Sequence, residues 1–339
     1  MKKYRYFSHF PSNIAHVVFR RRPTVSCVVP LLILWIGVRF PRQWSLPSFP
    51  VPCHDPADYR PRSFRHPSSV ANASAATKKH KHPTADGTAN FLSHNHPNPI
   101  DKMANQLYQY SIISALMDGV ASHGTPIASV LAHGDHGLGT FRSMDGEMIV
   151  LDGAVFQMKS DGSIIPITAP ADTITPFATV TRFQPTERTR ATVTSKQDLA
   201  ALLNRLFPAA RNHFLAIRMD GVFKSINVRT AGGQCFPREG MVAVAERQTT
   251  HTFHGVRGTV VGFRCPDWTM GVNVAGDHMH FISEDRQRGG HILALETEGE
   301  VEVGVAMMSK FHVDLPEGDD EFNEAALVKD EKGIHAVEG

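Results

Sequence analysis

The stretch GDHMHFISEDRQRGGHIL, residues 276–293, has the pattern of two β-strands joined by a polar turn. Side chains two residues apart on a strand point to the same face, so His278 and His280 share one face. The polar run 283–290 is a natural reversal of the chain, and its midpoint places His291 about opposite His280 on the returning strand. The stretch therefore predicts a hairpin that carries three imidazoles on one face.

This arrangement of histidines is typical of a metal site. Cross-strand neighbours have Cβ atoms roughly 5 Å apart, so the three imidazoles converge without help from distant sequence. Neutral imidazole suits zinc, manganese, iron and nickel, and three protein nitrogens leave open positions for a substrate. We interpret His278, His280 and His291 as ligands of a divalent metal, Zn²⁺ or another such as Mn²⁺. The alternative is that these are surface histidines on a polar hairpin. If His278 and His280 were present without His291, the sequence would favour that alternative.

Four other histidines are interpreted as structural. His251 and His254 have helical spacing in a β-rich context, which does not bring their side chains together. His133 and His136 flank glycines, and we expect them in a loop.

A second interpretation of the hairpin is a cupin. His278, His280 and Glu284 fit the first half of a cupin metal motif, which would make the chain a metal oxygenase or isomerase. The second half of that motif, a Pro-x-Gly followed shortly by a histidine, is not found downstream, and His291 comes too early to supply it.

The rest of the C-terminal region is also rich in strand signals. Residues 147–158 have the pattern of a hairpin that turns at Asp152-Gly153, and residues 256–263 and 301–305 have that of strands. One helix is expected, beginning after Ser195 with apolar residues at helical spacing and ending before Pro208. Because strands dominate, we expect an α+β fold with a barrel-like or sandwiched sheet and few helices.

The charge of +2 hides a division of the chain into two regions. Residues 1–98 carry 14 Lys/Arg against 3 Asp/Glu, whereas residues 99–339 carry 21 against 30. The acidic region has no basic stripe that would attract nucleic acid, and we expect it to be the catalytic domain. The four cysteines are widely spaced, without a Cys-x-x-Cys pair, which argues against a cysteine-type zinc site.

The basic region, residues 1–98, holds 12 of the 22 prolines, and we expect a disordered extension. Its apolar run, residues 25–38, is shorter than the roughly 20 residues that cross a bilayer as a helix. A membrane association is therefore not expected unless this run is an anchor. Two interpretations of this region remain open: a targeting segment, or an extension without a targeting function. We expect a cytoplasmic protein, with targeting to an organelle or secretion as alternatives.

From about Ile100 to its end the chain resembles the bacterial α-acetolactate decarboxylase family. The block GDHGLGTFRSMDGEMIVLDG, residues 134–153, is similar to the family's GDFGLGTF, LDGEMI and DG segments. The segments VRT (228–230) and GTVVGFRCP (258–266) also match, and the latter leads into the histidine hairpin. The chain departs from the family where His136 replaces an aromatic residue, Met144 a leucine and Asp277 a tyrosine. The change at residue 277 could alter the surroundings of the metal.

The resemblance implies a two-part mixed β-sheet, barrel-like domain with few helices, in a homodimer. It implies that Glu338 joins the three histidines at the metal, that Glu147 is the acid/base carboxylate and that Arg229 grips the carboxylate of a 2-hydroxy-3-oxo acid. The implied reaction converts 2-acetolactate to acetoin and CO₂ in acetoin biosynthesis, with the metal stabilising the enediolate as a Lewis acid. Either Glu147 or Glu338 could deliver the proton.

Overall fold

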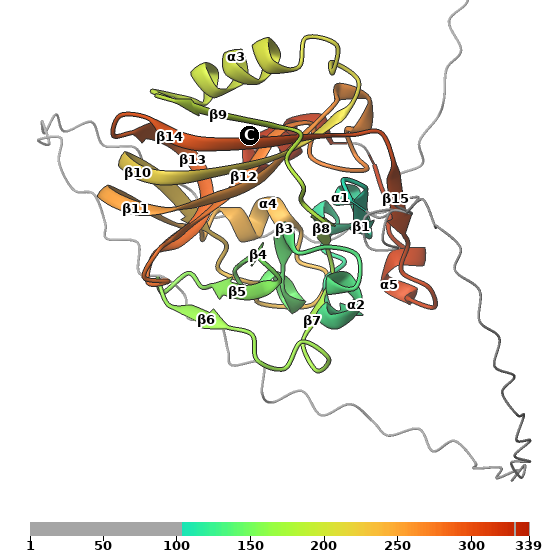
Figure 1. Ribbon diagram of the computed structural model, residues 1–339. Helices are drawn as coiled ribbons and strands as arrows, with labels where there is room; N and C mark the ends of the chain where they lie inside the picture. The colour runs from blue at the N-terminus through green and yellow to red at the C-terminus, as the bar shows by residue number, and fades with distance from the viewer. Residues whose placement is uncertain (1–103, 329, 339) are drawn as a thin grey trace, which may run out of the picture. The chain divides into compact units, whose positions relative to one another are not determined.

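The computed structural model describes residues 104–328 and 330–338, so the expectations for residues 1–98, including the run 25–38, lie outside the described residues. Two large sheets form the body of this part, one of seven strands and one of six. In Figure 1 the strands β9–β14 lie above the strands β3–β6. None of the helices described is long and apolar enough to cross a membrane.

The seven-stranded sheet is mixed. All its neighbouring strands are antiparallel except β1 and β15, which run parallel. The predicted hairpin 147–158 is confirmed as β4 and β5, and Asp152 and Gly153 both have positive φ, 53° and 79°, as a two-residue turn of type I′ requires. In spatial order the strands are β15 (Phe311–Asp314), β1 (Leu107–Tyr110), β8 (Ala178–Thr181), β3 (His136–Thr140), β4 (Glu147–Leu151), β5 (Ala154–Met158) and β6 (Ile164–Pro166).

The six-stranded sheet is antiparallel and partly closed. β10 pairs with β11 along nearly its whole length, and its two halves also pair with β14 and β13. Since β11 pairs with β12 and β12 with β13, the strands β10–β13 form a closed circuit, which confirms the barrel-like expectation. In spatial order the strands are β11 (Thr249–Cys265), β12 (Gly276–Ser283), β13 (Gly289–Thr297), β10 (Phe214–Thr230), β14 (Val301–Met308) and β9 (Glu187–Ala191).

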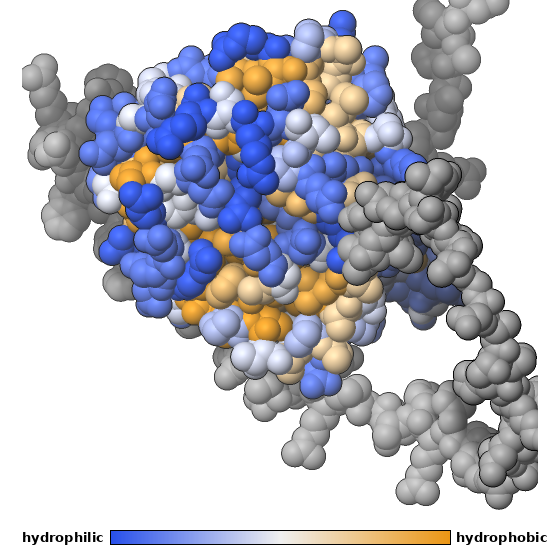
Figure 2. All heavy atoms as spheres, in the orientation of Figure 1, coloured by the Kyte–Doolittle hydropathy of each residue, from blue (hydrophilic) through white to orange (hydrophobic). Residues whose placement is uncertain are grey.

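The predicted helix is α3 (Lys196–Leu206). The hydroxyl of Ser195 accepts a hydrogen bond from the backbone N–H of Asp198 at 3.1 Å, which caps the first turn as expected. Leu199, Leu202 and Leu203 are buried against apolar residues of the six-stranded sheet. On the face shown in Figure 2, hydrophilic residues are interspersed with smaller hydrophobic patches.

Three other short helices pack against one another in a second apolar cluster. They are α1 (Ile113–Met117), α4 (Met241–Ala245) and α6 (Glu331–Glu338). Ile334 and Val337 of α6 are buried in this cluster. Glu338, the last residue of the helix, is also buried. The remaining elements are the pair β2 (Thr125–Pro126) and β7 (Ile174–Thr175), the helices α2 (Ile127–Leu131) and α5 (Asp320–Asn323), and the 3₁₀ turns Arg142–Met144 and Asp267–Thr269.

Alternation along β10, β12 and β13 places the polar residues between the two sheets. One face of these strands supplies apolar side chains to the cluster that α3 covers, among them Val228, Met279, Phe281 and Ile292. Neighbouring residues point to the opposite face of a strand. That face therefore carries Arg229, His278, His280 and His291, of which Arg229 and His280 contact β4.

Candidate active site

The three histidines of the hairpin lie together, as their spacing predicted. His280 and His291 are register partners on β12 and β13. The ring centroids of the three are separated by 4.9 Å to 5.4 Å, and one ligand atom from each lies within 4.8 Å of the other two.

These imidazoles are buried and short of hydrogen-bond partners. His278 is 5% exposed, and His280 and His291 are fully buried. The ring nitrogens Nε2 of His278 and His280, and both ring nitrogens of His291, have no hydrogen-bond partner. Burial lowers the pKa of all three rings, that of His280 to about 3, so the rings are neutral. Because unpaired buried nitrogens are costly and neutral imidazole is the form that binds metals, the three residues fit a divalent metal.

The orientation of His280 is set from the other sheet. Its Nδ1–H donates a hydrogen bond to the carbonyl of Met148 on β4 at 2.7 Å. This bond fixes the tautomer and leaves the lone pair on Nε2 free to bind a metal. Sequence reasoning missed this contact, because a backbone carbonyl leaves no signal in residue identity.

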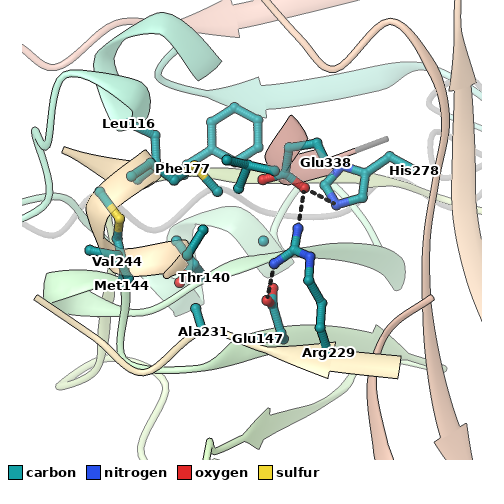
Figure 3. A pocket seen from close by; sticks show the side chains of 14 residues that line it. Leu116, Thr140, Met144, Glu147, Phe177, Arg229, Ala231, Val244, His278 and Glu338 are labelled. Carbon is teal, nitrogen blue, oxygen red and sulfur yellow. Dashed lines mark hydrogen bonds and ion pairs between the residues drawn. The ribbon is translucent and has the colours of Figure 1, made fainter. Parts of the chain in front are cut away.

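Arg229 joins the two glutamates that the resemblance placed in the site. Its Nη1 donates to Oε1 of Glu147 at 3.1 Å, and its Nη2 donates to Oε2 of Glu338 at 3.0 Å. The same Oε2 of Glu338 lies 3.4 Å from Nε2 of His278 and 3.5 Å from Nδ1 of His291. Figure 3 shows the guanidinium between the two carboxylates. The structure therefore brings together all six residues expected in the site.

Burial also shifts the pKa of the two carboxyl groups. That of Glu147 rises to about 7 because the group is buried; the charge of Glu338 adds to this, whereas Arg229 and a hydrogen bond from the backbone of Ala231 oppose it. The pKa of Glu338 is raised by burial and opposed by Arg229 and Lys196.

Gly290 permits the close approach of β13 to β10. Its φ is 149°, and a Cβ at this position would lie 2.7 Å from the carbonyl oxygen of Arg229. A side chain would therefore force the strands apart next to His291, which is the register partner of Arg229.

A small pocket lies beside these groups. Figure 3 shows the polar side chains of Arg229, Glu147 and Glu338 at one part of its wall and apolar side chains at another. The apolar wall comes largely from the helices α1, α4 and α6 and includes Leu116, Met144, Phe177, Val244 and Val337. Sequence reasoning missed these residues. The helices α1 and α4, with five residues each, are too short to show a hydrophobic period, and Met144 and Phe177 lie outside the α-helices.

Comparisons with known proteins show the family of the chain. The family model described as alpha-acetolactate decarboxylase matches residues 107–329. The chain belongs to the alpha-acetolactate decarboxylase family. The alpha-acetolactate decarboxylase of Methylococcus capsulatus is 40% identical over 243 residues, which cover 71% of this chain and 91% of that protein. That of Klebsiella aerogenes is also 40% identical, with 71% of this chain and 88% of that protein covered.

Solved structures confirm the expected fold class. The crystal structure of alpha-acetolactate decarboxylase from Bacillus subtilis strain 168 superimposes with a TM-score of 0.65 at 34% identity, covering 69% of this chain and 99% of that chain. A Staphylococcus aureus protein, described as of unknown function and similar to alpha-acetolactate decarboxylase, gives a TM-score of 0.66 at 29% identity, with 69% and 100% covered.

Membership of the alpha-acetolactate decarboxylase family argues against the cupin interpretation, and the position of Glu284 does so as well. Glu284 is exposed, in the turn that follows β12, whereas His278 and His280 are buried.

The expectation that His136 lies in a loop is wrong. His136 begins β3 and is 2% exposed, with its Nε2–H donating to the carbonyl of Ile217 at 3.1 Å. The neighbouring Gly137 is also part of β3, and it permits the close approach of β8. A Cβ at this position would lie 2.3 Å from the carbonyl oxygen of Thr179. His133 does lie in a turn, after α2, and stacks on Tyr108 with ring centroids 3.8 Å apart.

Proposed function

We propose that this protein converts 2-acetolactate to acetoin and CO₂ at a divalent metal held by His278, His280, His291 and Glu338. One observation carries the proposal: in a member of this family, three buried imidazoles have ring nitrogens without a hydrogen-bond partner. Two of these nitrogens, in His278 and His291, lie near the same oxygen of Glu338. Imidazole nitrogens and carboxylate oxygens are both ligands that zinc takes in proteins.

The wall of the cavity matches the two chemical halves of acetolactate. Arg229 has five N–H donors, and the two hydrogen bonds to glutamates leave three, including a buried Nε–H without a partner. Those donors can bind the substrate carboxylate, to which a guanidinium is geometrically suited. The apolar side chains of Leu116, Phe177 and Val244 supply a surface for the two methyl groups.

Loss of CO₂ leaves an electron pair on the adjacent carbon, which delocalises onto the ketone oxygen. A bound divalent metal supplies Lewis-acid stabilisation of the negative charge on that oxygen. The chain itself contributes Arg229, which orients the carboxylate, and buried walls that exclude water.

The two glutamates are assigned different roles. Glu338 has one oxygen within 3.5 Å of two ring nitrogens, which favours it as the metal ligand. Glu147 approaches only His280, at 3.5 Å, and contacts Arg229 through its other oxygen. We assign to Glu147 the proton that replaces CO₂ on the substrate carbon.

The proposal extends to the metal, the assembly and the location. Zn²⁺ is proposed as the native metal, with Mn²⁺ as the alternative, because the donor set is mainly imidazole. We further propose that residues 99–339 are the catalytic domain of a cytoplasmic homodimer. Elemental analysis, light scattering and cell fractionation test these three points.

The proposed reaction is tested on the purified full-length chain with racemic acetolactate. Acetoin is measured against a blank without protein, before and after treatment with a chelator and after addition of Zn²⁺ or Mn²⁺. The chelator should abolish acetoin formation, and metal should restore it. A folded protein that holds one metal per chain and forms no acetoin contradicts the proposal.

A further inference from the structure

The three histidines are not held equally firmly by the sheet. β12 pairs with β11 from Gly276 to Ser283, but with β13 only from His280 to Ile282. His278 therefore stands on a segment of β12 that has one strand neighbour, whereas His280 has two. A strand segment that is paired on one side has fewer hydrogen bonds to fix its position.

The side chain of His278 also lacks the kind of support that His280 has. His280 donates to the carbonyl of Met148. Within residues 104–328 and 330–338 the ring of His278 has no such bond, and its close polar neighbour is Glu338 at 3.4 Å. Its position must therefore come from the backbone of β12.

A pair of charged side chains fixes that backbone from the other face of the strand. Asp277 precedes His278, and its register partner on β11 is Arg264. Arg264 donates from Nε to Oδ1 of Asp277 at 2.6 Å and from Nη2 to Oδ2 at 2.8 Å. The two side chains are 18% and 12% exposed, so solvent screens this pair less than a surface ion pair.

The pair is also tied to the helix that covers the sheet. Nη1 of Arg264 donates to the side-chain oxygen of Asn204 on α3 at 2.9 Å. The guanidinium thus joins β12 to α3 through hydrogen bonds with a fixed planar geometry. On β12 these hydrogen bonds are made by Asp277, the residue before His278.

We propose that Arg264 and Asp277 are positioning residues that hold His278 in the geometry required for metal binding. The inference rests on the metal site of the proposed function and does not depend on the substrate.

The test measures metal binding on the full-length chain. The affinity for Co²⁺ is determined by competition with a chromogenic chelator, and the visible absorption of the Co²⁺-loaded protein reports the ligand geometry. Asp277→Asn and Arg264→Met should each weaken binding by about tenfold or more and change the absorption bands. The value of kcat at saturating metal should change less than the affinity.

A matched control is available on β10. Arg218 donates to both carboxylate oxygens of Asp220, at 2.7 Å and 3.3 Å, so Asp220→Asn breaks a similar pair in the same sheet. This variant should bind Co²⁺ as the wild type does. An equal loss of affinity in Asp220→Asn would show a general effect on the sheet and would overturn the inference.

Unchanged affinity and absorption in both Asp277→Asn and Arg264→Met would also overturn it. If neither variant folds, Asp277→Glu keeps the charge and displaces the carboxylate by one methylene. Weaker binding in that variant supports the inference, and wild-type binding contradicts it. A wild-type protein that binds no Co²⁺ overturns the proposed function itself, whereas unchanged variants overturn only the role of this pair.

Discussion

His280 on β12 and His291 on β13 lie directly opposite each other, with their ring centroids 5.4 Å apart. Two of the proposed ligands are therefore placed by one local hairpin, whose turn is polar and whose returning strand begins with two glycines. The other proposed ligands need structure from outside the hairpin: the pairing with β11 for His278 and the packing of α6 for Glu338.

Replacing His280 should remove the metal. In His280→Ala the site keeps two imidazoles, and we expect acetoin formation to fall by more than about 100-fold, with metal content well below one per chain. His254→Ala changes an exposed histidine on β11 and should leave both quantities unchanged. Full activity in His280→Ala would rule out the proposed site.

Measurements of metal affinity distinguish the proposed site, in which Glu338 is a ligand, from the cupin interpretation, in which Glu284 is a ligand. Glu338→Gln removes the charge that faces His278 and His291, so it should weaken metal binding by at least about tenfold. Glu284→Ala removes an exposed side chain in the turn after β12 and should not change binding. The cupin interpretation requires the reverse result in equilibrium metal titrations.

Arg229 should not be replaceable by lysine. An ammonium cannot bridge two carboxylates and a substrate carboxylate with the planar fork of a guanidinium. We expect Arg229→Lys to lower kcat/KM by about 100-fold or more. Arg218→Lys, at a partly exposed ion pair on the same strand, should change kcat/KM little. If Arg229→Lys keeps the wild-type kcat/KM, Arg229 does not bind the substrate carboxylate.

His136 should make the protein sensitive to acid. Burial and the charge of Arg218 lower its pKa to about 3, against the hydrogen bond to Ile217 and the charges of Asp152 and Asp220. Because the pKa is about 6.5 in the unfolded chain, the neutral ring contributes fully to stability above pH 6.5. That contribution is lost toward pH 3, at about 1.4 kcal/mol per pH unit.

His136→Phe removes this group and keeps an aromatic ring against Phe183. Relative to wild type, its free energy of unfolding should improve by about 2 kcal/mol between pH 7 and pH 5. Urea unfolding with a chelator present measures this, since the titration of the other histidines is common to both proteins and cancels. A difference between the two proteins that is the same at both pH values would contradict the assignment.

Local features of the fold could be predicted from the sequence because the information lies within a few residues. The turn at Asp152-Gly153, the capped start of α3 and the histidine hairpin are of this kind. The closure of β10–β13 was expected only as a class of fold, since its register depends on pairing between strands far apart in the chain. His136 was misplaced because glycines signal loops and also signal close strand contacts.

The site divides in the same way. Spacing identified the three histidines, whereas Arg229 meets Glu147 across 82 residues and Glu338 across 109, so only the family resemblance could point to them. Neither the spacing nor the resemblance predicted the apolar wall of the cavity or the contact with the carbonyl of Met148. Their positions result from the packing of short helices and of one sheet on the other.

The most direct test of the central claim is a titration of metal-free protein with Zn²⁺ while acetoin formation from acetolactate is followed in the same sample. We predict no activity above the blank without metal, a linear rise with added Zn²⁺ and a plateau at one equivalent per chain. Activity in the metal-free protein equal to that at the plateau, or no acetoin at one bound equivalent, would contradict the account.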